Sequence, residues 1–207
     1  MVSKTTVFIV DDDKEVRDAL VLLMESVGLR ATAFDSAQAF LDQFDATIPG
    51  CVITDVRMPG MSGLELQKKL NEKNLHPQII IITGHGDIPM TVESMRQGAL
   101  DFIEKPFNDQ RLLDSVHRAI EIDASKRGQA TRIAEIQERM ETLTKREREV
   151  MNLITRGKRN KIIADELHVT QSTVEAHRSK VMEKMQAESL SDLMRMVLSL
   201  EMGQGKP

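Results

Sequence analysis

The chain contains neither tryptophan nor tyrosine, and its only cysteine is Cys51. A single thiol excludes an intrachain disulfide, so the fold must depend on packed cores, and a reducing compartment is expected. No apolar run approaches the roughly 18 residues that a membrane-spanning helix needs. The opening segment, MVSKTTVFIV, also lacks the long apolar region of a secretory leader. These absences predict a soluble, cytoplasmic protein without a membrane partner.

Charge divides the 207 residues into two parts. Residues 1–122 carry 12 Lys and Arg against 19 Asp and Glu, whereas residues 123–207 carry 16 against 13. The weakest hydrophobic pattern lies between them, at 123–142, where Ile133, Ile136 and Met140 still recur at helical spacing. We therefore predict a first domain at 1–122, a helical linker at 123–142 and a second domain at 143–207.

The first domain alternates short apolar runs with segments of helical period. The runs are 6–10, 31–34, 51–54, 78–82 and 101–103, and the helix-like segments lie near 13–27, 36–44, 63–71, 88–98 and 109–122. Nearly continuous Ile and Val runs indicate strands that are covered on both faces. Five β-α units in succession predict an α/β fold with a doubly wound parallel sheet, on which ligands bind beyond the carboxyl ends of the strands.

Polar side chains stand at those strand ends. Asp11-Asp12-Asp13 follow the first run, Asp55 the third, Thr83-Gly84 the fourth and Glu104-Lys105-Pro106 the fifth. Carboxylates gathered on one rim repel one another unless a cation is present, and Mg²⁺ prefers such oxygen donors. A carboxylate beside a metal ion and a lysine suggests phosphoryl transfer to aspartate.

Each of these signals also has an ordinary structural explanation. An Asp triplet after a strand commonly caps a helix, and Thr-Gly and Lys-Pro commonly form turns. The interpretation depends on four such signals falling in order at the ends of strands one, three, four and five. Within the triplet, Asp13 is expected to cap the next helix. Lys105-Pro106 is expected to be a cis peptide.

These motifs resemble the receiver domain of two-component response regulators over about residues 4–122. The similarity lies in VDDD, ITDVRMPGMSG, ITGHGD and DFIEKPF, and it is closest to the FixJ group. It implies that Asp55 accepts a phosphoryl group and that Mg²⁺ is held by Asp11, Asp12, Asp55 and the Arg57 backbone carbonyl. It further implies that Thr83 and Lys105 contact the phosphoryl group.

The same resemblance implies a switch and a dimer. Thr83 would move toward the new phosphoryl charge and Phe102 would follow it, although Phe102 is equally explained as a core residue. Met90, Met95 and Leu112 would line a dimer of phosphorylated receivers, although methionine at helical spacing is more often part of a core.

The second domain shows only helical periods from Leu143 to Leu200. Thr144 and Glu147 form a capping-box signature that starts a helix ending near Thr155. Two further segments, 160–167 and 170–174, are joined by a three-residue turn, which is the pattern of a helix-turn-helix. On the second of these helices Val174, Val181 and Met185 share one face, and the opposite face is polar.

This region resembles the LuxR-type (NarL/FixJ) output domain, through LTKREREV, Gly157, NKIIA, TVEAHR and KM. A solvated amphipathic helix is the other interpretation of the polar face. The resemblance implies DNA binding through residues that meet base edges or phosphates, and dimerisation through the last helix. The DNA set is Arg156, Lys158, Lys161, Thr173, Glu175, Ala176, Arg178, Ser179, Lys180 and Lys184, and the dimer set is Leu190, Leu193, Met194 and Val197.

Together these expectations describe a phosphorylation-dependent transcriptional regulator, which we expect to activate transcription, although the sequence alone does not distinguish an activator from a repressor. Its partners would be a sensor histidine kinase, double-stranded promoter DNA, RNA polymerase and a second copy of itself, and its only enzymatic steps would be self-phosphorylation and autodephosphorylation. One alternative is a Mg²⁺-dependent aspartyl-phosphate phosphatase, but Val56 and Arg57 stand where a second catalytic acid would be needed. Another is a constitutive nucleic-acid-binding protein whose receiver serves only for docking.

Overall fold

The computed structural model describes residues 5–84 and 88–204, and the chain forms two compact units, residues 1–127 and 128–207. Each unit has two hydrophobic cores of its own and is described by itself. His85, Gly86 and Asp87, which belong to the ITGHGD motif, lie outside the described residues.

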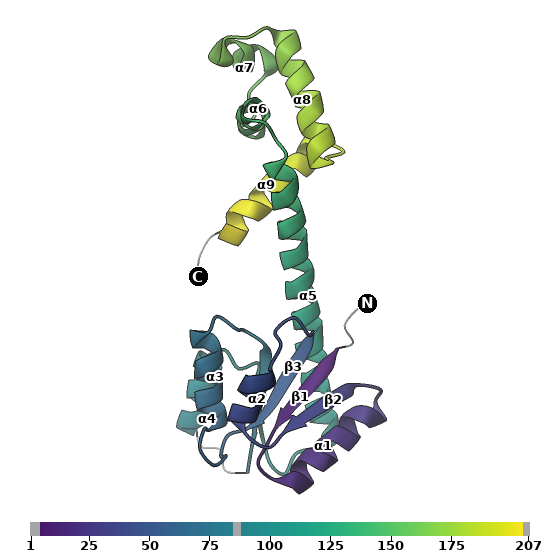
Figure 1. Cartoon of the computed structure of the whole chain (residues 1–207), viewed down its shortest axis with the longest axis vertical. Coiled ribbons are helices and arrows are strands. Elements are labelled where there is room, and N and C mark those ends of the chain that lie inside the picture. The colour runs from purple at the N-terminus through teal and green to yellow at the C-terminus, as the bar shows by residue number, and fades with distance from the viewer. Residues whose placement is uncertain (1–4, 85–87, 205–207) are drawn as a thin grey trace. The chain divides into compact units, whose positions relative to one another are not determined.

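The first unit is built on one parallel sheet (Figure 1). Its strands are β1 (Thr6–Val10), β2 (Arg30–Phe34), β3 (Gly50–Asp55), β4 (Gln78–Thr83) and β5 (Asp101–Glu104). They lie in the order β2-β1-β3-β4-β5, and each neighbouring pair is parallel. Every residue of β3 and β4 is buried, because helices cover both faces of the sheet. The predicted doubly wound α/β fold is confirmed.

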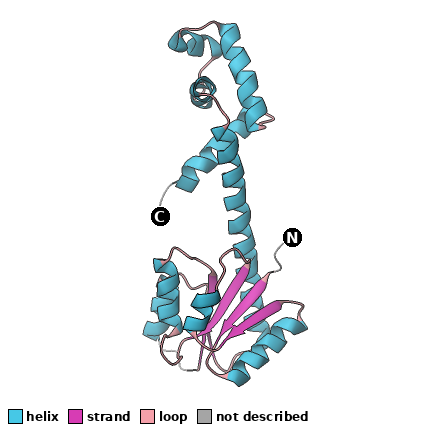
Figure 2. Ribbon diagram, viewed as in Figure 1, coloured by secondary structure: helices cyan, strands magenta, loops and turns pink. Residues whose placement is uncertain are grey.

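Helices lie on both faces of the sheet (Figure 2). Two hydrophobic cores fill the space between the sheet and these helices. The helices are α1 (Lys14–Ser26), α2 (Ala37–Gln43), α3 (Gly63–Glu72), α4 (Ile88–Arg96) and α5 (Asp109–Glu141). One core joins α1 and α5 to the sheet through residues such as Leu20 and Val116. The other joins α2 and α3 to the opposite face and contains Phe40, whose ring contacts Phe8 edge-on at a centroid distance of 5.9 Å. Alternate strand residues therefore belong to different cores.

Polar caps start the helices that begin next to the site. The Asp13 side chain accepts hydrogen bonds from the backbone amides of Glu15 and Val16, which confirms it as the N-cap of α1. Ser62 and Glu65 form a capping box at the start of α3. These caps fix where the chain turns from the sheet edge into each helix.

Helix α5 is longer than the sequence analysis expects. A helix near 109–122 and a helical linker at 123–142 are in fact one helix of 33 residues. Asp123 is buried and accepts a hydrogen bond from the backbone N–H of Gly50, and Arg127 donates to the carbonyls of Ala46, Thr47 and Ile48. These contacts attach the helix to the first unit as far as Arg127.

The second unit is helical. After the end of α5 it contains α6 (Lys145–Thr155), α7 (Asn160–Leu167), α8 (Gln171–Met185) and α9 (Leu190–Gln204). The expected capping box at Thr144 is present, and His168 ends α7 in the left-handed conformation, with φ of 53°. Val174, Val181 and Met185 are fully buried, as predicted. Helices α7 and α8 with their short turn form the expected helix-turn-helix.

Among residues 5–84 and 88–204, no helix is both long enough and apolar enough to span a membrane.

Candidate functional site

The carboxyl ends of β1 and β3 bring two aspartates together. Val10 pairs with Thr54 in the parallel register of these strands, so Asp11 and Asp55 follow at the same level of the sheet. Thr83 ends β4 and pairs with Glu104 of β5, and Lys105 comes directly after Glu104. The register thus places the side chains from four strand ends on one rim.

Lys105 bridges the two carboxylates. Its Nζ donates to Oδ2 of Asp11 at 3.0 Å and to Oδ1 of Asp55 at 3.1 Å, and both aspartates are buried. Burial raises the pKa of Asp55, and the hydrogen bond from Lys105 only partly opposes this effect. Burial acts to lower the pKa of Lys105, but its hydrogen bonds to Asp11 and Asp55 outweigh that effect and raise it. The lysine therefore remains an ammonium.

The turn after β3 fixes the direction of Asp55. The Arg57 backbone N–H donates to Oδ2 of Asp55 at 2.7 Å, and the Gly63 N–H donates to the carbonyl of Val56 at 3.0 Å. Gly60 has a φ of +81°, a conformation that glycine adopts without steric cost. The carboxylate consequently has one oxygen on a backbone amide and the other on Lys105. The Lys105-Pro106 peptide is cis, as predicted.

The remaining predicted residues of the rim occupy different environments. Thr83 is buried, with a relative exposure of 1%, whereas the side chain of Asp12 is exposed. Phe102 is half-buried and packs against the core that contains Phe40. Sequence reasoning missed Arg17, whose Nη1 donates to the backbone carbonyl of Asp11 at 2.6 Å from one turn inside α1. Its position six residues after Asp11 is the only sequence signal for this contact.

The donor chemistry of the rim fits Mg²⁺, although its geometry is incomplete. Across the described part of the chain, no three His, Cys, Asp or Glu side chains are arranged to hold a metal ion. Asp11 and Asp55 are close enough to share Lys105 and offer hard oxygen donors, which Mg²⁺ prefers. The predicted third carboxylate, Asp12, has an exposed side chain and does not share Lys105 with Asp11 and Asp55.

The outer surface of α8 is a second candidate site. We call Gln171, Ser172, Glu175, Ala176, Ser179 and Lys180 the α8 ridge, because all six side chains are exposed on the helix that follows the turn. Thr173, a predicted phosphate contact, is half-buried at the start of the helix, where its backbone N–H donates to the Thr170 cap. Sequence reasoning missed Gln171, which donates to Glu175 one helical turn later. The spacing of four residues was the available signal.

The predicted phosphate-contacting cations differ in their availability. Arg156, Lys161 and Lys180 are exposed. Lys158 pairs with Glu166 at 2.5 Å on the surface, where such a pair is weak.

Two other cations, both half-buried, make hydrogen bonds within the domain. Arg178 donates to the Asn160 side chain at 3.3 Å and so links α8 to α7. Lys184 donates to the buried carboxylate of Glu147 at 2.7 Å and to the Thr142 carbonyl at 3.2 Å. Because its charge is already compensated there, we remove Lys184 from the DNA-contacting set.

The predicted dimer contacts also need correction. Leu112 and Leu193 are fully buried in the cores of their own units, so neither side chain is available at a surface. Their helical spacing indicated an apolar face but not which part of that face packs internally. Met95 and Met194 are exposed, with relative exposures of 46% and 38%. Met90, Leu190 and Val197 are partly buried and pack against their own cores.

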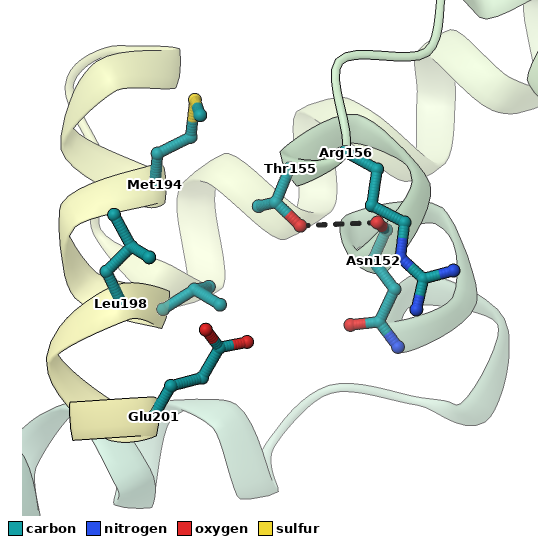
Figure 3. A pocket seen from close by; sticks show the side chains of 7 residues that line it. Asn152, Thr155, Arg156, Met194, Leu198 and Glu201 are labelled. Atoms are coloured by element: carbon teal, nitrogen blue, oxygen red, sulfur yellow. Dashed lines mark hydrogen bonds between the residues drawn. The ribbon is translucent and has the colours of Figure 1, made fainter. Parts of the chain in front are cut away.

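A cavity of about 480 Å³ separates α6 from α9 (Figure 3). Met194 and Leu198 of α9 line one wall, and Asn152 of α6 and Arg156, the residue after α6, line the other. Arg156 therefore lies at the edge of the exposed apolar surface of α9, as well as at the end of α6.

Known proteins share both halves of this arrangement. Residues 7–117 match the family described as the response regulator receiver domain, and residues 141–197 match the bacterial regulatory proteins of the luxR family. Nodulation protein W of Bradyrhizobium diazoefficiens is 47% identical over 94% of this chain and 86% of its own length. The transcriptional regulatory protein FixJ of Azorhizobium caulinodans is 45% identical over 93% of this chain and 91% of its own.

Solved structures show the same similarity. The response regulator StyR has a TM-score of 0.86 at 42% identity, covering 94% of this chain and 98% of its own. Full-length FixJ from B. japonicum has a TM-score of 0.58 at 42% identity, and the match covers 97% of this chain and 98% of the FixJ chain. The chain therefore belongs to the response regulators of the NarL/FixJ type, in which a receiver domain is followed by a LuxR-type DNA-binding domain.

Proposed function

We propose that this protein is a phosphorylation-dependent transcriptional activator, in which Asp55 accepts a phosphoryl group from a sensor histidine kinase. The observation that carries the proposal is the Asp55 carboxylate, which is buried at the carboxyl end of β3 and hydrogen-bonded to Lys105 beside Asp11. Membership of the receiver family supports the same role for the site. The FixJ relatives are named transcriptional regulatory proteins, which supports an output in transcription.

The transfer needs little from the protein beyond position and charge. A carboxylate oxygen of Asp55 attacks phosphorus as the phosphorus–nitrogen bond to the kinase histidine breaks, and the released imidazole takes up a proton. Mg²⁺, held by Asp11, Asp12, Asp55 and the Arg57 carbonyl, would supply positive charge that stabilises the phosphoryl oxygens. The backbone amide of Arg57 already holds one oxygen of Asp55, which directs the other toward the rim.

Lys105 and Thr83 would form hydrogen bonds to the new phosphoryl group. Lys105 is shared between Asp11 and Asp55, so a phosphoryl oxygen offers its ammonium a stronger partner at nearly the same place. Thr83 ends the adjacent strand and is buried at the rim. A hydrogen bond from its hydroxyl to the phosphoryl group would draw the following loop inward, and Phe102 would move into the space that this frees.

The response would be dimerisation. Met90 and Met95 on α4 would contribute to pairing of the receivers, and Leu190, Met194 and Val197 on α9 would contribute to pairing of the output domains. Two linked output domains would bind a two-fold-related promoter site more tightly than one and recruit RNA polymerase there. A complete switch from 1:99 to 99:1 would require about 5.5 kcal/mol of differential stabilisation, so a partial shift in population is expected.

The place of action follows from these partners. A receiver that takes its phosphoryl group from a kinase and delivers an output to promoter DNA would work in the cytoplasm. Its enzymatic activity would be limited to phosphorylating itself from phosphodonors and hydrolysing its own acyl phosphate, without turnover of external phosphoesters.

Treatment with a small-molecule phosphodonor and Mg²⁺ tests the proposed acceptor. Intact-mass measurement is expected to show one added phosphoryl group on wild type and none on Asp55→Asn. Asp35→Asn is the matched control, because Asp35 follows β2 at the same edge of the sheet but is exposed. It should be labelled as wild type is. An unlabelled wild type, or a labelled Asp55→Asn, would refute the assignment.

Sizing of the same samples tests the output. The labelled wild type is expected to shift toward a dimer and to bind duplex DNA more tightly, while Asp55→Asn should show neither change. Dimerisation or DNA binding that responds to the phosphodonor equally in Asp55→Asn would leave the receiver as a docking module only. Sustained release of phosphate from an external phosphoester would instead favour a phosphatase.

A further inference from the structure

The side chains of the α8 ridge differ in length in a way that bears on base recognition. Ser172, Ala176 and Ser179 are small, so Glu175 and Gln171 are the long side chains on the N-terminal half of the ridge. In a helix-turn-helix, the N-terminal residues of the second helix meet base edges in the major groove. These two residues are therefore placed to extend farthest toward a base.

Glu175 is an unexpected residue on a surface that approaches a polyanion. Its side chain is exposed, and its Oε1 accepts a hydrogen bond from Gln171 Nε2 at 3.4 Å. Among the described residues, no lysine, arginine or histidine nitrogen lies within 4.0 Å of its carboxylate, and the same is true of Glu183 on this helix. An unpaired carboxylate on this surface weakens the attraction of the protein to DNA phosphates at every DNA sequence.

Base chemistry limits which partner can compensate for that repulsion. In the major groove, guanine presents two acceptors and thymine an acceptor and a methyl group, and neither base offers a donor to a carboxylate. Cytosine presents the donor N4 amino group, which glutamate accepts from, and adenine presents its N6 amino group beside the acceptor N7. Cytosine is the base whose edge faces the carboxylate with a donor and no acceptor.

We propose that Glu175 is a specificity-determining residue that selects cytosine at one position of each half-site, and that Gln171 is the residue that positions its carboxylate. This inference rests on the proposed binding of double-stranded DNA. Glu175 acts chiefly by rejection, because any other base leaves its charge without a donor or opposite an acceptor. Gln171 acts through Glu175 by restricting the rotamers of that side chain.

Selection from a randomised duplex library tests the proposal, with the full-length chain treated with phosphodonor and Mg²⁺. Wild type should select half-sites with one invariant cytosine, which Glu175→Ala no longer selects. Glu175→Gln should shift that position toward adenine, because an amide matches the adenine edge. Gln171→Ala should weaken the cytosine preference and leave the other positions unchanged.

Titrations on fixed duplexes then give the size of the effect. Replacing the selected cytosine should weaken wild-type binding by about 5- to 150-fold and Glu175→Ala binding much less. On duplexes of unrelated sequence, Glu175→Ala should bind more tightly than wild type. Glu183→Ala is the matched control, since it removes the same charge from an exposed position two turns farther along α8. It should keep the selected motif.

The outcomes separate this inference from the function on which it rests. If wild type selects no motif and shows no salt-sensitive binding to duplex DNA, both proposals fail. If wild type selects a motif that Glu175→Ala and Glu175→Gln keep at every position, DNA binding stands and the role of Glu175 is refuted. A loss of cytosine preference in Glu183→Ala as well would refute it too, because the effect would then follow net charge.

Discussion

Gly63 shows how closely one residue can control the acceptor site. A Cβ atom at this position would lie 2.2 Å from the carbonyl oxygen of Asp55 and 3.0 Å from the Thr54 hydroxyl. Because the nearer atom belongs to the backbone, the methyl group could be accommodated only by moving the strand end that carries Asp55. The second glycine of the PGMSG turn therefore permits α3 to begin against β3.

We expect Gly63→Ala to be less stable than wild type by about 1–3 kcal/mol, as for other overpacked sites. It should also lose most labelling by a phosphodonor. Thermal unfolding and intact mass measure the two effects. Gly128→Ala is the control, because its added Cβ meets no atom within 4 Å and Gly128 lies inside a helix. Its free energy of unfolding should rise by up to about 1 kcal/mol, and the phosphodonor should label it as it labels wild type. Normal labelling of Gly63→Ala would contradict the packing argument.

Glu147 is a buried carboxylate that joins two helices of the output domain. It accepts from Lys184 of α8 and from the backbone N–H of Thr144, and these bonds lower its pKa from 4.5 to about 2. A group whose pKa is lowered by folding stabilises the folded state above its unfolded pKa. That contribution is therefore present above pH 4.5 and disappears as the pH falls toward 2.

Glu147→Gln should consequently destabilise the output domain by about 1–3 kcal/mol near neutral pH, because it removes a charged partner from a buried pair. The difference from wild type should shrink as the pH falls from 4.5 toward 2. Hydrogen exchange of amides in α6 and α8 reports the local opening free energy. Glu149→Gln removes the charge from the more exposed pair with Arg146, and it should change this opening free energy by less than about 1 kcal/mol. A difference that stays constant with pH would contradict the linkage.

At the scale of elements, the least expected feature is the attachment of α5 to the loop before β3. Asp123 is buried and accepts from the Gly50 N–H at 2.9 Å and from Arg127 Nε at 2.8 Å. The Arg127 guanidinium in turn donates to carbonyls of residues 46–48. Cys51 lies beside this cluster, and burial together with the Asp123 charge raises the pKa of its thiol to about 12. The cluster both anchors the helix and keeps the thiol unreactive.

Asp123→Ala should open this region, because it leaves the buried Gly50 N–H without its acceptor at a cost of about 1–3 kcal/mol. Since Cys51 is the only thiol, its rate of modification by a thiol reagent measures the opening. The rate should rise clearly in Asp123→Ala and less in Asp123→Asn, which keeps an acceptor oxygen. Asp114→Asn changes an exposed residue of the same helix and should match wild type. An unchanged rate in Asp123→Ala would show that the cluster does not hold the loop.

At the scale of the whole molecule, an acidic receiver and a basic output domain are joined in one chain. Attraction to DNA should therefore come from a limited set of cations and depend steeply on salt. Lys161 is exposed on α7, and no carboxylate of the described residues lies within 4.0 Å of its ammonium. Unlike Lys184, it is available to a phosphate.

Lys161→Ala should weaken binding to all duplexes by a similar factor and reduce the slope of log K against log salt by about 1. Fluorescence titrations of the full chain at several salt concentrations measure both quantities. Lys68→Ala removes the same charge from an exposed position in the receiver and should leave the slope unchanged. Equal effects of the two substitutions would show that binding responds to net charge and not to contacts of α7.

The sheet could be predicted because its strands are near-continuous runs of Ile and Val separated by helical periods. The grouping of polar residues on one rim could then be predicted from the sheet, since the carboxyl ends of neighbouring parallel strands share an edge. The continuity of α5 was harder to predict, because Asp123 and Arg127 look like linker residues until the loop at 46–50 is placed beside them. Leu112 and Leu193 were assigned to surfaces for a related reason, since helical period does not show how much of an apolar face is covered.

By itself the sequence determined the α/β order, the helix caps, the helix-turn-helix and the polar residues at the strand ends, because these depend on local periodicity and on residues close in the chain. The tertiary structure decided which of those polar residues meet. It placed Lys105 between Asp11 and Asp55, which are 94 and 50 positions away, and it assigned Lys184 to Glu147 rather than to a phosphate. Such pairs depend on strand register and helix packing, and no local pattern encodes them.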